Sequence, residues 1–156
     1  MNRLARLDPI DYLMIGHITR DLVPGGSVIG GTASYSSRAA RALGLRVGIV
    51  TACEDCAETP ELQNIPIAGL YSDVTTTFEN IPTPLGRIQR IHNRAPNLDL
   101  SLVPEEWRSA PIIHLGPVAN EVDPNLVRAF PTALIGVTPQ GWMREWDRDG
   151  RVRFTD

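Results

Sequence analysis

The chain has 156 residues, of which 42% are hydrophobic, and its 15 basic and 18 acidic side chains give a net charge of −3. This length and apolar content suit a single domain, 1–156, with one core. A mildly acidic chain lacks the concentrated positive face that nucleic acids require. Every basic side chain is arginine, so chemistry that depends on a lysine amine is excluded.

Membrane insertion and secretion are also not expected. No segment has the roughly 20 apolar residues that a membrane-spanning helix needs. The charged start of the chain does not lead into an apolar stretch, as a secretory signal would. Two cysteines cannot build a disulfide framework for a domain of this size. We therefore expect a cytoplasmic protein with neither a membrane nor a nucleic acid as partner.

Five short apolar runs predict β-strands. They cover 12–18, 47–53, 67–71, 112–115 and 133–137. Most lack polar alternation, which favours strands buried on both faces of a parallel sheet. Segment 33–43, after the first strand, has helical spacing and is followed by Gly44, a residue typical of helix C-termini. The order strand, helix, strand predicts an α/β fold. Short helices that open with proline are expected at 104–108 and 124–130.

Two extended segments, 74–81 and 87–94, do not fit the central sheet. They are rich in threonine and β-branched residues, and the turn-forming stretch 82–86 joins them. This pattern predicts a β-hairpin over about 74–94 that projects from the α/β layer. A second hairpin is expected near the end of the chain, around 147–150.

Two groups of side chains each have two interpretations. Arg90, His92 and Arg94 share one face of the predicted hairpin, where a solvated face is favoured over a patch for an anionic ligand. Cys53 and Cys56 have the spacing of a redox pair or half a zinc site. No second cysteine pair exists and two acids separate the thiols, so two free thiols are favoured.

The residues that say most about function lie between 15 and 51. Asp21 follows the first predicted strand, and open α/β sheets bind ligands at the carboxyl ends of their strands. A carboxylate there accepts hydrogen bonds from two adjacent hydroxyls of a polyol. Gly30 and Gly31 lack a Cβ and let a ligand approach the backbone before the helix begins. The alternative is a purely structural role, in which Asp21 caps a turn and the two glycines form a hinge.

Segment 30–44, Gly-Gly-Thr-Ala-Ser-Tyr-Ser-Ser-Arg-Ala-Ala-Arg-Ala-Leu-Gly, resembles the first signature of the ribokinase-like (PfkB-type) carbohydrate kinases. Thr-Thr-Thr-Phe at 75–78 resembles part of the family's β-lid over the sugar site. Ile-His-Leu-Gly at 113–116 resembles the strand that leads back to that site. The resemblance implies a truncated ribokinase-like α/β fold, in which a Rossmann-like parallel sheet is flanked by helices and carries a projecting β-hairpin lid.

The same resemblance implies a set of substrate-binding residues, which are Asp21, Gly30, Gly31, Thr19, Thr32 and Tyr35. Asp21 matches the aspartate that holds sugar hydroxyls, and the diglycine lines the sugar and hinges the lid. Thr19 stands where ribokinase itself has an asparagine, and Tyr35 stands where many members have another. The Gly-Gly-Thr opening with Tyr35 looks more like inositol-kinase-like members.

The family's later Gly-Ala-Gly-Asp segment supplies the base and the phosphate cradle, and it has no counterpart in these 156 residues. The chain is therefore expected to be the substrate-binding half of a carbohydrate or polyol kinase, with no catalytic, cofactor-binding or metal-ligating residues of its own. ATP and Mg²⁺ are implied for the full-length family member. The alternative is a stand-alone module that binds a small polyol or nucleoside without catalysis.

Self-association is expected as well. A two-stranded hairpin is only marginally stable by itself, and lid strands in the resembling family often pair across a dimer. The apolar strand predicted at 133–137 is expected to be fully buried. An open sheet edge beside it would favour pairing with a strand of a second copy. We expect a homodimer through the β-lid or through this open edge.

Overall fold

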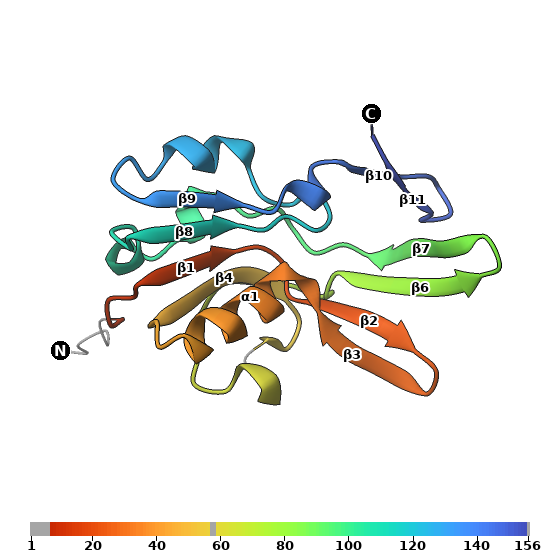
Figure 1. The fold of residues 1–156 in the computed structure, drawn as a ribbon, viewed down its shortest axis with the longest axis horizontal. Coiled ribbons are helices and arrows are strands. Elements are labelled where there is room, and N and C mark those ends of the chain that lie inside the picture. The colour runs from red at the N-terminus through yellow and green to blue at the C-terminus, as the bar shows by residue number, and fades with distance from the viewer. Residues whose placement is uncertain (1–6, 57–58, 156) are drawn as a thin grey trace.

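The computed structural model describes residues 7–56 and 59–155. Their strands form three sheets (Figure 1). A five-stranded sheet has the order β5-β4-β1-β8-β9, and all its neighbouring strands are parallel. A four-stranded sheet, called the lid sheet below, has the order β3-β2-β6-β7. The third sheet is the hairpin β10-β11 near the C-terminus. The expected α/β class with a parallel sheet is confirmed.

The central sheet contains every strand predicted for it. Its members are β1 (Tyr12–Ile15), β4 (Val47–Cys53), β5 (Ile67–Tyr71), β8 (Ile112–Leu115) and β9 (Leu134–Val137). The first strand is shorter than expected and ends at Ile15. The expectation of a fully buried last strand is wrong, because β9 lies at the sheet edge and leaves Leu134 70% exposed.

Different elements cover the two faces of this sheet. The predicted helix is α1 (Gly31–Ala42), which packs Ala33 and Ala40 against β1 and β4. The opposite core surrounds the fully buried Trp107. Short 3-10 turns replace the predicted helices at 104–108 and 124–130. The 3-10 elements given for the described residues are Pro60–Leu62, Leu100–Leu102, Glu105–Trp107, Pro124–Arg128 and Pro139–Gly141. No helix in the described residues is long and apolar enough to cross a membrane.

The lid sheet is built from two hairpins. The predicted one is β6 (Thr77–Thr83) with β7 (Gly86–Asn93), and it projects beyond the central sheet (Figure 1). The second is β2 (Thr19–Val23) with β3 (Gly26–Gly30), which sequence reasoning did not identify. Because β2 also pairs in parallel with β6, the projecting hairpin is part of a larger sheet.

The expected terminal hairpin is present as β10 (Arg144–Trp146) and β11 (Val152–Phe154). It lies against the lid sheet and leaves the edge of β9 uncovered. Trp146 and Val152 pack on Phe78 and Ile91, and the Ile91 amide donates to the Gly150 carbonyl at 2.8 Å.

A buried carboxylate joins the loops that follow β1 and β8. Glu121 is 1% exposed. It accepts hydrogen bonds from the backbone amides of His17 at 3.0 Å, Val118 at 3.0 Å and Ala119 at 2.7 Å. Such bonds compensate the cost of burying a charge, so this carboxylate fixes both loops.

His17 extends this link to the lid sheet. Its Nε2 lies 2.9 Å from the Pro96 carbonyl, which only accepts, so Nε2 carries the proton. Burial lowers the pKa of His17, which favours the neutral ring. In the neutral ring Nδ1 accepts from the Thr76 hydroxyl at 2.8 Å, and the Thr76 oxygen accepts from the Ala95 amide at 2.9 Å.

We predict that Glu121→Gln lowers the free energy of unfolding by about 3 kcal/mol, because the amide nitrogen cannot accept from the buried N–H groups. Glu106→Gln is the matched control at an exposed glutamate and should change stability by less than about 0.5 kcal/mol. Urea unfolding followed by circular dichroism measures both variants. Equal losses in the two variants would contradict the proposed role of Glu121.

Candidate functional site

A polar cavity of about 430 Å³ lies between the lid sheet and the start of α1. The lid sheet contributes Thr19, Asp21, Phe78, Asn80, Arg87 and Gln89. The start of α1 contributes Gly31, Thr32, Tyr35 and Ser36. The remaining wall comes from β8, from the segments after β8 and β9, and from the start of β10; it consists of His114, Val118, Thr138, Gln140 and Arg144. Five of the six expected substrate-binding residues therefore border one cavity, and Gly30 lies directly beside it.

Asp21 is the carboxylate of this cavity. It lies within β2, and not after a strand as the sequence suggested. Its Oδ1 accepts from the Thr19 hydroxyl at 3.4 Å, whereas Oδ2 has no hydrogen-bond donor among the described residues. Burial raises the pKa of Asp21, and the hydrogen bond from Thr19 opposes this shift. Asp21 can thus accept hydrogen bonds from a ligand.

The two glycines make room for this arrangement. A Cβ on Gly30 would lie 2.6 Å from Asp21 Oδ2 and 2.8 Å from Thr19 Oγ1. Gly31 has a φ of +86°, and a Cβ there would lie 2.5 Å from the His17 carbonyl oxygen. Within the chain, the diglycine lets β2 and the loop after β1 lie against the start of the helix. Gly31 borders the cavity, and the ligand approach predicted from the sequence stays a prediction for this residue.

The opposite wall is held by side-chain hydrogen bonds. Gln140 donates to Thr32 Oγ1 at 3.2 Å. His114 bonds the Tyr12 hydroxyl through Nδ1 and Thr138 Oγ1 through Nε2, the latter at 3.1 Å. Burial lowers the pKa of His114, which favours the neutral ring. Apart from Arg144, this wall therefore offers neutral hydrogen-bonding groups.

Two arginines of the cavity, Arg87 and Arg144, were not identified from the sequence. Of the three hairpin residues that the sequence singled out, Arg94 and His92 are engaged elsewhere. Arg94 donates to the Ala119 carbonyl at 2.8 Å, and His92 pairs with Glu79 at 2.8 Å. The interpretation of these hairpin residues as a patch for an anionic ligand is therefore not favoured. Arg87 is the first of the basic residues in this hairpin segment. Only the register of β7 could have shown that its side chain borders the cavity.

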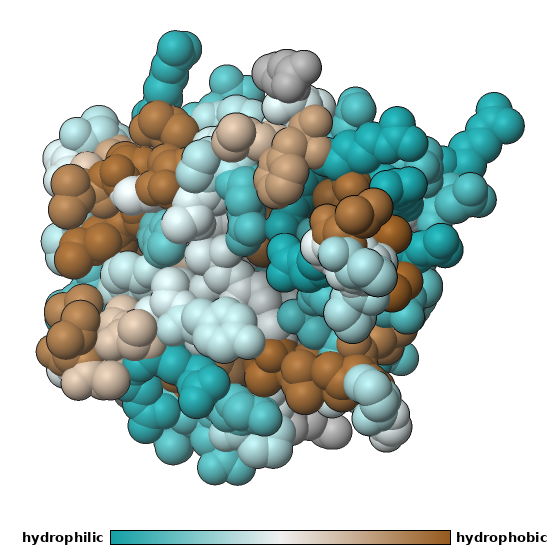
Figure 2. Space-filling view, turned by 45° about the vertical axis from the view of Figure 1, so that its right-hand side comes forward, coloured by the Kyte–Doolittle hydropathy of each residue, from teal (hydrophilic) through white to brown (hydrophobic). Residues whose placement is uncertain are grey.

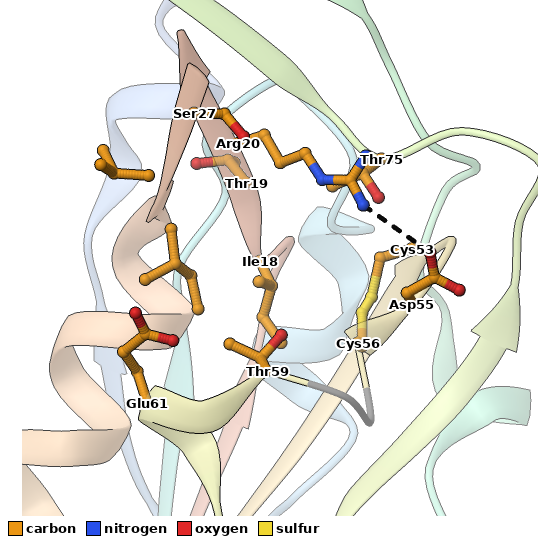
Figure 3. A pocket seen from close by; sticks show the side chains of 12 residues that line it. Ile18, Thr19, Arg20, Ser27, Cys53, Asp55, Cys56, Thr59, Glu61 and Thr75 are labelled. Atoms are coloured by element: carbon orange, nitrogen blue, oxygen red, sulfur yellow. Dashed lines mark ion pairs between the residues drawn. A yellow bond between two sulfur atoms is a disulfide. The ribbon is translucent and has the colours of Figure 1, made fainter. Parts of the chain in front are cut away.

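A second cavity, of about 250 Å³, borders the other face of β2 (Figure 3). There the Arg20 side chain reaches across to Asp55 at 3.8 Å (Figure 3). It also pairs with Glu54 at 3.2 Å. Arg20 and Asp21 lie on opposite faces because successive strand residues alternate. Of the expected site residues, Thr19 alone borders this second cavity.

The cysteines beside this second cavity correct an expectation. The structure joins Cys53 and Cys56 in a disulfide, so the prediction of two free thiols is wrong (Figure 3). The physical reason is the turn after β4, which brings the two Cα atoms to 5.7 Å, a separation suited to a disulfide.

No protein-family model matches the sequence, and no curated protein matches it either. Solved structures do match. One is a pyrophosphate-dependent kinase of the ribokinase family complexed with a pyrophosphate analogue and myo-inositol, at 20% identity and a TM-score of 0.73 over 92% of this chain and 54% of that one. Another is ribokinase from Arabidopsis thaliana complexed with ribose and ATP, at 12% identity and a TM-score of 0.59 over 83% and 53%.

A third match is a nucleoside kinase from Methanocaldococcus jannaschii, at 14% identity and a TM-score of 0.56 over 86% of this chain and 54% of that one. These likenesses establish that the chain has the fold of ribokinase-family kinases, as the sequence resemblance implied. The chain spans about half the length of the structures it matches.

We predict that Gly31→Ala costs at least about 1 kcal/mol more stability than Gly44→Ala. Both glycines have nearly the same positive φ, +86° and +87°, but nothing lies within 4 Å of a Cβ at Gly44. The pair therefore separates backbone strain from the close approach to the His17 carbonyl. Chemical unfolding of both variants gives the difference, and equal losses would show that the close approach is not a constraint.

Proposed function

We propose that this chain forms the acceptor-binding half of a kinase that transfers a phosphoryl group from ATP to a hydroxyl of a sugar or polyol. The observation that carries this proposal is the half-buried Asp21 carboxylate, whose Oδ2 has no donor among the described residues and borders a cavity between the lid sheet and α1. The cavity also borders the carboxyl ends of β8 and β9, and open α/β sheets bind ligands at the carboxyl ends of their strands.

The chemistry of the cavity suits a polyhydroxy compound. Asp21 accepts hydrogen bonds from two neighbouring hydroxyls, and charge-assisted bonds of this kind are the stronger ones. Thr32 and Gln140 on one side, with Asn80 and Gln89 on the other, supply neutral donors and acceptors. Structures with this fold include complexes with myo-inositol and with ribose, which supports the same class of acceptor here.

The residues of this chain do not fit a site for the nucleotide or its metal. The sequence has no Gly-Ala-Gly-Asp segment and no lysine. Within 7–56 and 59–155, no three side chains of the histidine, cysteine, aspartate or glutamate type gather where a metal ion could bind. We therefore assign ATP and Mg²⁺ binding, and the base, to residues other than these, and propose that this chain alone transfers no phosphoryl group. A cytoplasmic location stays a prediction.

We predict that Asp21→Asn weakens the binding of a neutral polyol such as myo-inositol or ribose about tenfold or more, because it removes a charge-assisted acceptor. Binding by the parent should also weaken as pH falls through the pKa of Asp21, which burial raises. Calorimetry measures both effects, and Asp73→Asn is the matched control at an exposed aspartate outside the cavity. Equal affinity in a folded Asp21→Asn chain would remove Asp21 from the site.

We further propose that the chain forms a homodimer. Hydrophobic side chains reach the face shown in Figure 2 in separate patches. In the lid sheet, β3 is an edge strand, and Leu22, Val23 and Val28 of β2 and β3 are at least 38% exposed. In the central sheet, Leu134 is exposed on the edge strand β9. An unpaired edge with apolar side chains favours pairing with a second copy.

We predict a mass of twice the single chain by light scattering at micromolar concentration. Val28→Arg would disperse a dimer formed through the lid sheet, whereas Leu134→Arg would disperse one formed through β9, because a charge on an edge strand opposes pairing. A parent chain that remains monomeric would contradict the proposed homodimer.

A further inference from the structure

The cavity that holds Asp21 carries an excess of positive charge. Two guanidinium groups, those of Arg87 and Arg144, border it together with a single carboxylate. His114 adds no charge, since burial favours its neutral form. A neutral polyol would leave this excess uncompensated.

Arg144 is fixed in place by contacts that leave its charge unpaired. Its Nη1 donates to the Val118 carbonyl at 2.9 Å, and its guanidinium carbon lies 5.5 Å from the centre of the Phe78 ring. The buried Nε has no hydrogen-bond partner among the described residues. Burial, and next the charge of Arg87, lower the pKa of Arg144, while the charges of Glu121 and Asp21 oppose this shift. Orphaned donors and nearby like charges are costly unless a ligand uses them.

Arg87 is the second free cation. It lies near the start of β7, is exposed, and forms neither an ion pair nor a side-chain hydrogen bond within the described part of the chain. Gln89, on the same face of β7, also borders the cavity, whereas Arg90 does not. Arg87 and Arg144 come from distant segments, so the fold brings two unpaired guanidinium groups to one cavity.

We propose that the acceptor carries an anionic group, a phosphate monoester or a carboxylate, which Arg87 and Arg144 bind while Asp21 accepts its hydroxyls. This inference rests on the proposed function and narrows its substrate class from neutral polyols to polyol phosphates or polyol acids. Planar guanidinium groups bind such anions in a bidentate manner, and two of these groups border this cavity.

The test is calorimetry of the 156-residue chain with matched probes. The pairs are myo-inositol with myo-inositol 1-phosphate, ribose with ribose 5-phosphate, and glucose with gluconate. Inorganic pyrophosphate is added as a probe for the phosphoryl donor. We expect one anionic probe to bind at least about tenfold more tightly than its neutral partner, since charge-assisted contacts exceed neutral ones by that amount.

Arg87→Gln should abolish this preference, so that the anionic probe binds no more tightly than its neutral partner. Arg87 is exposed, so this variant is expected to fold, and Arg144→Gln with a check by circular dichroism provides the second test. Arg90→Gln is the matched control on the opposite face of the same strand and should keep the preference.

Three results would overturn the proposal. If a neutral polyol binds through Asp21 and no anionic partner binds more tightly, the proposed function stands and the anion site is wrong. If pyrophosphate alone binds through Arg87 and the monoesters gain nothing, the arginines serve the donor. If no probe binds, the proposed function fails together with this inference.

Discussion

The architecture depends on one buried hydrogen-bond network, in which Glu121 holds the loops after β1 and β8 and His17 joins them to Thr76 of the lid segment. Each member satisfies a buried polar group of another, so removal of one leaves an uncompensated donor or charge. The candidate site lies between the two sheets that this network connects. Its shape therefore depends on residues that do not touch the cavity.

The diglycine is the second constraint on the site. Gly30 gives space to the Asp21 carboxylate, and Gly31 lets the helix begin directly against the loop after β1. A side chain at either position would displace the carboxylate or the helix start. The glycines thus affect the candidate acceptor site chiefly by leaving space for the Asp21 carboxylate and for the backbone at the start of α1. The surrounding fold is that of ribokinase-family kinases.

Much of the central sheet could be predicted, because strands buried on both faces leave uninterrupted apolar runs such as 47–53. The hairpin β2-β3 could not, since its apolar residues are interrupted by Pro24 and glycines and its pairing with β6 is long-range. Asp21 was proposed from its place after a predicted strand and from the family resemblance, and Thr19 and Thr32 were proposed from the resemblance alone. Arg144 was not predicted as a site residue, because only tertiary packing brings the segment after β9 back to the lid sheet.

The central claim is that a polyhydroxy acceptor binds between the lid sheet and α1. A titration of the ¹⁵N-labelled chain with myo-inositol and myo-inositol 1-phosphate tests it most directly, because each backbone amide reports its own surroundings. The account predicts that the amide signals of Asp21, Gly31 and Thr32 shift on binding while those of Glu61 and Tyr71, remote from this cavity, do not. The central claim would be contradicted if only the amide signals of residues around the second cavity, beside Arg20 and Cys53, shifted and those of Asp21 and Gly31 did not.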